Sequence, residues 1–123
     1  MNAPLRTKPT LEGIARATAA EFDISLKDLL SHTRLRHIAR PRQHAMALAY
    51  ELTSKSYPQV GEFFNRDHTT VMHAHSQANL RLLDNPELAD RIDRIITAAT
   101  PAVFQVDWVR TVPFKHKGDW HGR

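Results

Sequence analysis

The chain has 123 residues, which fits a single domain with short extensions, and it contains no cysteine. Disulfide bonds, thiolate metal sites and a cysteine nucleophile are therefore excluded, and a cytoplasmic protein is favoured. Lysine and arginine together number 17 against 13 aspartates and glutamates, so the net charge is +4. We find neither a stretch of about 18 apolar residues that would cross a membrane nor a secretory signal.

The positive charge is unevenly distributed along the chain. Residues 31–43 contain four arginines and no acidic residue, whereas acidic residues outnumber basic ones in residues 84–94. A run of charge usually marks only a solvated face. A concentrated basic segment also fits a polyanion such as nucleic acid, so its meaning depends on the elements around it.

The spacing of apolar residues predicts an all-α domain of six helices in residues 10–100. We expect residues 1–9 to form a flexible arm and residues 101–123 to form an extended or partly disordered tail. The residues expected to face the core at helical spacing are Leu11, Ile14, Ala15, Ala19, Phe22, Ala45, Leu48, Ala49, Leu52, Val71, Ala74, Ala78, Leu82, Leu88, Ile92, Ile95, Ile96 and Ala99.

The first three helices are expected at residues 11–22, 26–30 and 41–53. Thr10 and Ser25 are suitable N-caps for the first two, and Pro41 suits the first turn of the third. The intervening residues 31–40 are expected to form a basic loop.

The last three helices are expected at residues 58–64, 68–83 and 86–99. Ser56 and Gln59 have the spacing of a capping box at the first of these, and Asp67 is placed to cap the second. Asn65 and Arg66 are left between these two helices as a tight turn.

A short helix, a tight turn and a longer helix form a helix-turn-helix, the motif in which the second helix enters the major groove of DNA. Here that helix starts with the sequence Asp67, His68, Thr69 and Thr70. A carboxylate accepts a hydrogen bond from cytosine, and a threonine offers a hydroxyl and a methyl group to base edges. The alternative is that Asp67 is only a cap and that the threonines are merely exposed.

Three stretches resemble the C-terminal DNA-binding domain of the bacterial replication initiator DnaA. They are Ala-Arg-Pro-Arg-Gln at residues 39–43 with the helix after it, Pro-Gln-Val-Gly at 58–61, and Arg-Asp-His-Thr-Thr-Val-Met-His-Ala at 66–74. The resemblance extends more weakly over residues 10–100. It implies a six-helix fold of the DnaA domain IV type, similar to the Trp repressor, that binds double-stranded DNA at an A/T-containing DnaA box.

The resemblance also implies roles for individual residues. Arg34 matches the arginine that enters the minor groove, where A·T-rich sequence strengthens the negative potential. The residues that match base readers in the major groove are Asp67, His68, Thr69 and Thr70. The residues that match contacts with the sugar-phosphate backbone are Arg42, Gln43, Thr53, Tyr57, Pro58, Arg66 and His73.

Two departures from the family pattern affect these expectations. Relatives carry two glycines before Arg-Asp-His-Thr-Thr, whereas only Asn65 stands between Phe64 and Arg66 here. Asparagine tolerates the left-handed conformation that such a turn requires, but one residue fewer should rotate or shift the following helix. The four glycines of the chain form no GxxxxGK[S/T] loop, so we expect no ATP, no other cofactor and no enzymatic activity.

Two groups of residues raise the alternative of a zinc site, namely His68, His73 and His75, and His116, Asp119 and His121. Neither group offers the convergent ligands that a tetrahedral site needs, so no metal is expected.

A chain of this kind could regulate a replication origin or transcription, and compete or cooperate with the complete initiator in the bacterial nucleoid. Because family members read an asymmetric box, the resemblance favours a monomer, with dimerisation through residues 101–123 as the alternative. A protein-interaction module that recruits a replication component is the second functional class. Binding to a DnaA box and to unrelated DNA distinguishes the two classes.

Overall fold

The computed structural model describes residues 9–100, so the expectations for residues 1–8 and for the tail at 101–123 lie outside the described residues. Within that range the chain forms six helices and no strand, and the predicted all-α architecture is confirmed. The helices are α1 (Leu11–Glu21), α2 (Leu26–Leu30), α3 (Arg36–Leu52), α4 (Tyr57–Phe64), α5 (His68–Asp84) and α6 (Pro86–Ala99). Pro9, expected at the end of the arm, is buried.

Capping residues explain where several helices begin. The Thr10 hydroxyl accepts a hydrogen bond from the Gly13 amide (2.9 Å), and the Ser25 hydroxyl accepts one from the Asp28 amide (3.0 Å). Asn85 caps α6 in the same way. Each cap satisfies an amide that the geometry of a helix leaves without an internal partner.

Helix α3 begins at Arg36, and the prediction that it begins at Pro41 is wrong. The Leu35 carbonyl accepts hydrogen bonds from two amides one turn later (2.9 and 2.7 Å), so a helical turn forms ahead of the proline. Pro41 lies inside the helix, where its missing amide removes the hydrogen bond that the carbonyl four residues earlier would otherwise accept from it. That residue, His37, is exposed, and water can replace the missing bond. The basic loop therefore shrinks to residues 31–35.

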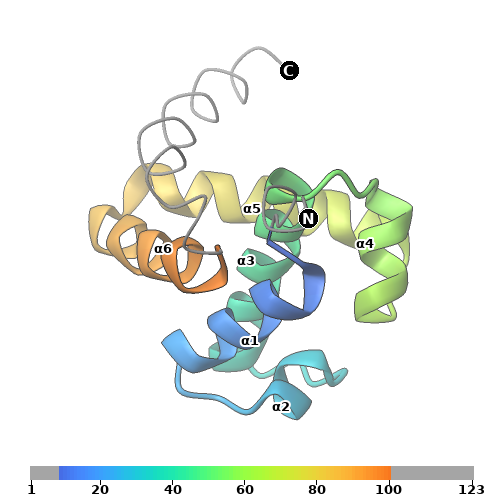
Figure 1. Cartoon of the computed structure of the whole chain (residues 1–123), viewed down its shortest axis with the longest axis horizontal. Coiled ribbons are helices and arrows are strands. Elements are labelled where there is room, and N and C mark those ends of the chain that lie inside the picture. The colour runs from blue at the N-terminus through green and yellow to red at the C-terminus, as the bar shows by residue number, and fades with distance from the viewer. Residues whose placement is uncertain (1–8, 101–123) are drawn as a thin grey trace, which may run out of the picture.

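Helix α3 lies at the centre of the molecule and packs against α1 and α5 (Figure 1). α4 packs on α5, and α6 packs against α1 and α5. Every predicted core residue is buried or packs against the core. Further buried apolar side chains that were not predicted are Leu29, Ile38, Met46, Ala47, Val60 and Phe64. None of the helices in the described range has the length and apolar composition that crossing a membrane requires.

Candidate nucleic-acid interface

The turn between α4 and α5 is closed by a single left-handed residue. Helix α4 begins at the predicted capping box, in which the Ser56 hydroxyl accepts from the Gln59 amide (3.3 Å) and the Gln59 side chain accepts from the Ser56 amide (2.9 Å). The helix ends at Asn65, whose φ of 58° and ψ of 49° lie in the left-handed region. The Arg66 amide then donates to the Gly61 carbonyl (2.7 Å). The predicted tight turn is therefore confirmed.

Gly61 allows this turn to approach α4 closely. A Cβ atom at this position would lie 2.4 Å from the Arg66 carbonyl oxygen and 3.4 Å from the Asp67 carbonyl carbon. The first distance is well below van der Waals contact, and the obstacle is backbone rather than a flexible side chain. In the sequence Gly61 is notable only as part of the stretch Pro-Gln-Val-Gly at residues 58–61, which predicts no role of its own for it. Its position four residues before a left-handed asparagine is the signal that points to this role.

The first turn of α5 gathers the residues predicted to read bases. Asp67 caps the helix, because its carboxylate accepts hydrogen bonds from the amide (3.0 Å) and from the hydroxyl of Thr69. The bonds from the Thr69 hydroxyl and amide hold the pKa of Asp67 below its ordinary value. The side chains of Asp67 and His68 are 65% and 51% exposed, and Thr69 and Thr70 are exposed as well. The ionised carboxylate can therefore accept further hydrogen bonds from outside the protein.

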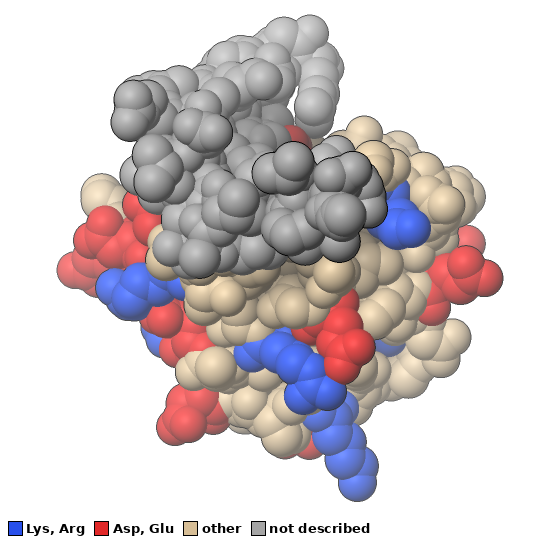
Figure 2. Space-filling model, viewed as in Figure 1, with Lys and Arg blue, Asp and Glu red and all other residues tan. Residues whose placement is uncertain are grey.

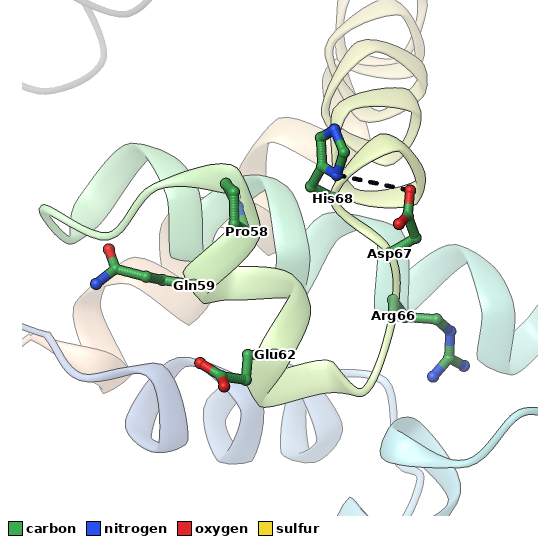
Figure 3. A pocket seen from close by; sticks show the side chains of 6 residues that line it. All are labelled: Pro58, Gln59, Glu62, Arg66, Asp67 and His68. Atoms are coloured by element: carbon green, nitrogen blue, oxygen red, sulfur yellow. Dashed lines mark ion pairs between the residues drawn. The ribbon is translucent and has the colours of Figure 1, made fainter.

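An open hollow of about 400 Å³ lies between α4 and the start of α5 (Figure 3). Its lining residues are Pro58, Gln59, Glu62, Arg66, Asp67 and His68. Asp67 and His68 lie side by side, with 3.7 Å between Oδ2 and Nδ1, while Arg66 points away from the side chains of α4 (Figure 3). The two helices of the motif thus present their N-terminal ends around one concave surface.

The loop at residues 31–35 is hydrogen-bonded to the turn between α4 and α5. The Nη2 atom of Arg66 donates a hydrogen bond to the Ser31 carbonyl (2.6 Å). Arg34, the residue predicted for the minor groove, is exposed in this loop. The structure therefore brings the segment that carries Arg34 against the turn from which α5 starts.

The residues predicted to contact the sugar-phosphate backbone differ in exposure. Pro58 and His73 are exposed, Gln43, Thr53, Tyr57 and Arg66 are partly buried, and Arg42 is buried. All four partly buried side chains have partners inside the protein. Gln43 accepts from Arg81 (2.6 Å), and the Tyr57 hydroxyl lies 3.1 Å from His75 Nδ1. The Thr53 hydroxyl donates to the Ala49 carbonyl (2.6 Å), and Arg66 donates to the Ser31 carbonyl as described above. The direct contact predicted for Arg42 stays a prediction, and its 6% exposure favours an indirect role.

His75 points into the protein, whereas His68 and His73 lie on the surface. The Nε2 atom of His75 is 2.6 Å from a carboxylate oxygen of Glu51, and its Nδ1 atom contacts the hydroxyl of Tyr57. This network, which the sequence did not reveal, joins α3, α4 and α5. The three histidines of the zinc alternative therefore do not converge.

Acidic and basic side chains of the described residues are interspersed on the face shown in Figure 2. The concentration of arginines found in the sequence lies around the 31–35 loop, where Arg34, Arg36 and Arg40 are exposed. The charge that could meet a phosphate backbone is thus next to the helix-turn-helix.

Comparison with known proteins identifies the family. A family model described as bacterial dnaA protein helix-turn-helix matches residues 11–77. The chain is 47% identical over 95 residues to the chromosomal replication initiator protein DnaA of Francisella tularensis subsp. novicida (strain U112), and equally to that of Francisella philomiragia subsp. philomiragia. The matches cover 71% of this chain and 19% of each relative, so the chain spans about a fifth of the length of the curated relatives it matches. The chain therefore belongs to the DnaA helix-turn-helix family, a family of DNA-binding domains.

Proposed function

We propose that the chain binds double-stranded DNA at a DnaA-box-like, A/T-containing site, with the start of α5 in the major groove and the 31–35 loop in the minor groove. The arrangement of exposed side chains carries this proposal. The four predicted base readers share the first turn of α5. The loop that holds Arg34 is hydrogen-bonded to Arg66, directly ahead of that turn.

The first turn of α5 has chemistry that suits base edges. The ionised Asp67 carboxylate can accept a hydrogen bond from cytosine N4, and His68 offers its ring nitrogens. Thr69 and Thr70 offer hydroxyls for hydrogen bonds and methyl groups that can pack against thymine. Because Asp67 also caps the helix through Thr69, the two side chains keep a fixed relation to each other.

Arg34 suits the minor groove at the other end of the site. A narrow A/T-rich minor groove has an enhanced negative potential that attracts an arginine. A G·C pair places the guanine amino group in the path of the side chain. Arg34 should therefore favour A·T pairs where the loop meets the DNA.

Contacts to the sugar-phosphate backbone would hold the duplex in register without reading its sequence. The residues proposed for these contacts are Gln43, Thr53, Tyr57, Pro58, Arg66 and His73. Backbone amides at the start of α4 would add to them, because the positive end of a helix attracts phosphate.

Bound to such sites, the chain would act at a replication origin or on transcription, and would compete or cooperate with a complete initiator. This places it with DNA in the nucleoid. Residues 9–100 carry one copy of the two proposed reading elements, which favours binding as a monomer to an asymmetric site.

Selection of bound sequences from a random DNA pool should yield an asymmetric, A/T-containing site. Replacing Thr69 or His68 by alanine should weaken binding to that site by about 1–3 kcal/mol and leave binding to random DNA almost unchanged. Fluorescence anisotropy titrations measure both. Ser76→Ala, at an exposed position further along α5, is the matched control and should bind like the parent chain. An equal loss on both DNAs, or no selected site, would instead favour a protein-interaction module.

A further inference from the structure

Arg42 is a buried cation on α3 that holds the neighbouring loop. Its Nε atom donates to the Leu29 carbonyl (2.7 Å), and its Nη1 atom donates to the Thr33 carbonyl (3.0 Å). Leu29 belongs to α2, while Thr33 directly precedes Arg34. The remaining nitrogen, Nη2, is buried and has no hydrogen-bond partner within the described residues. One nitrogen of Arg42 therefore binds the last turn of α2, a second binds the loop at Thr33, and the side chain is buried away from solvent.

A second guanidinium, that of Arg66 in the turn between α4 and α5, also binds the loop at residues 31–35. Arg66 donates to the Ser31 carbonyl (2.6 Å) through one nitrogen and to the Phe64 carbonyl (2.8 Å) through another. The Asn65 side chain adds a contact of 3.3 Å to the ring of His32. The loop is thus linked both to α3 and to the turn that starts α5.

Two guanidinium groups close to one loop are unfavourable in themselves. Burial lowers the pKa of Arg42, and the positive charge of Arg66 lowers it further. An arginine nevertheless stays charged, so its hydrogen bonds must offset the cost of burial. Hydrogen bonds from a charged donor are stronger than those between neutral groups, and the planar guanidinium fixes the directions of its donors. The arrangement therefore favours one geometry of the loop.

We propose that Arg42 is a positioning residue for sequence reading, which together with Arg66 fixes the loop that carries Arg34 relative to the first turn of α5. This inference rests on the proposed reading of two grooves and gives Arg42 an indirect part in it. Arg42 sets the position from which Arg34 enters the minor groove. Selectivity for A·T pairs at that end of the site, more than overall affinity, depends on Arg42.

Arg42→Lys separates positioning from phosphate contact. Lysine keeps the positive charge and can still bind a phosphate, but it cannot donate to both carbonyls in fixed directions as the planar guanidinium of arginine does. Titrations compare the selected site with a site that carries G·C pairs at the end assigned to Arg34. The variant should lose roughly tenfold discrimination between these sites and keep the salt dependence of the parent. Arg16→Lys, at an exposed position on α1, is the matched control and should keep both properties.

Combination with Arg34→Ala tests whether Arg42 acts through Arg34. Arg34→Ala alone should abolish the discrimination, and adding Arg42→Lys should cause no further loss. Full discrimination in Arg42→Lys, with a salt slope reduced by about one in Arg42→Ala, would show a direct phosphate contact and overturn the positioning role. A parent chain that does not discriminate between the sites would refute the proposed function itself.

A measurement without DNA tests the position of the loop independently. The chain has no cysteine, so Leu35→Cys, at a residue that is 59% exposed, provides a single site for a nitroxide label. Electron paramagnetic resonance should show a more mobile label when Arg42→Lys is added, and no change when the control Arg16→Lys is added. Thermal melting shows which variants are folded, and Arg66→Lys replaces Arg42→Lys if the latter unfolds. Equal mobility in all folded variants would overturn the positioning role.

Discussion

At the scale of single residues, the turn between α4 and α5 depends on the absence of a side chain at Gly61. Gly61→Ala would place a Cβ atom 2.4 Å from the Arg66 carbonyl oxygen, so the turn or α4 must move. We expect the free energy of unfolding to fall by about 2–3 kcal/mol, as for other overpacked sites. Urea denaturation measures this loss. Discrimination between DNA sites should fall as well, because the turn positions the start of α5.

Gly13→Ala is the matched control for this prediction. Its Cβ atom would lie 3.0 Å from the hydroxyl oxygen of the exposed Thr10 and 3.9 Å from the Ala99 carbonyl oxygen. Alanine favours a helix over glycine by about 1 kcal/mol, which offsets a small displacement of the cap. Equal destabilisation by the two substitutions would contradict the role given to Gly61.

His44 makes stability depend on pH. It is only 2% exposed, and its Nε2 atom lies 3.0 Å from Nη1 of Arg81. Burial, followed by the charges of Arg81 and Arg40, lowers the pKa of His44 from 6.5 to about 4. Between these values the unfolded chain binds a proton that the folded chain does not. Stability is therefore complete above the ordinary pKa and should fall by roughly 3 kcal/mol as the pH drops toward the lowered one.

Urea denaturation across this pH range checks the prediction. His44→Gln keeps an acceptor for Arg81 but cannot be protonated, so it should remove most of the slope between the two pKa values. His37→Gln, at an exposed position, should leave the slope unchanged. Parallel pH profiles for the parent chain and His44→Gln would show that another group is responsible.

At the scale of helices, α4 depends on its capping box, because a helix of eight residues is not stable alone. Ser56→Ala removes the hydroxyl that accepts the Gln59 amide and should lower the free energy of unfolding by about 1 kcal/mol. Ser54→Ala, at an exposed position in the same connection, should cost much less. Denaturation curves that shift equally for both variants would argue against the cap.

Local signals also explain which helix boundaries could be predicted. The starts of α1, α2, α5 and α6 follow residues whose side chains cap them, and α4 follows a capping box. Helix α3 has no such signal, because its N-cap residue Leu35 makes no capping hydrogen bond through its side chain. Proline is common in the first turn of a helix, so the sequence predicts that α3 starts at Pro41. In the structure Pro41 lies inside the helix.

Some features of the candidate site could be predicted from local sequence, and others could not. The start of α5 could be predicted because Asp67 caps it, and the proposed role of its first residues in reading bases comes from the resemblance to the family. The role of Arg42 could not, because the carbonyls that it binds are 13 and 9 residues away in the sequence. The partner of His75, Glu51, is 24 residues away. Such contacts arise only when the helices pack, and no local pattern reports them.

At the scale of the whole molecule, α6 is tied back to α1. Arg91 and Arg94 both pair with the Glu21 carboxylate, at 3.1 and 2.9 Å. The hydrogen bond from Arg94 is the main cause that holds the pKa of Glu21 below its ordinary value. The family match ends at residue 77, so Arg91 and Arg94 lie beyond the matched residues, whereas Glu21 lies within them. These ion pairs join the last described helix to the first.

The central claim is that two elements of this bundle read two grooves of one DNA site. Binding titrations that combine Arg34→Ala or Thr69→Ala with DNA changed either at the A/T end or beneath α5 test it most directly. Each substitution should lose its effect only on the DNA whose matching bases have been changed. The matched pairs should show a coupling of about 1–3 kcal/mol, and the unmatched pairs should show almost none. Coupling near zero in all four combinations would contradict the two-groove reading.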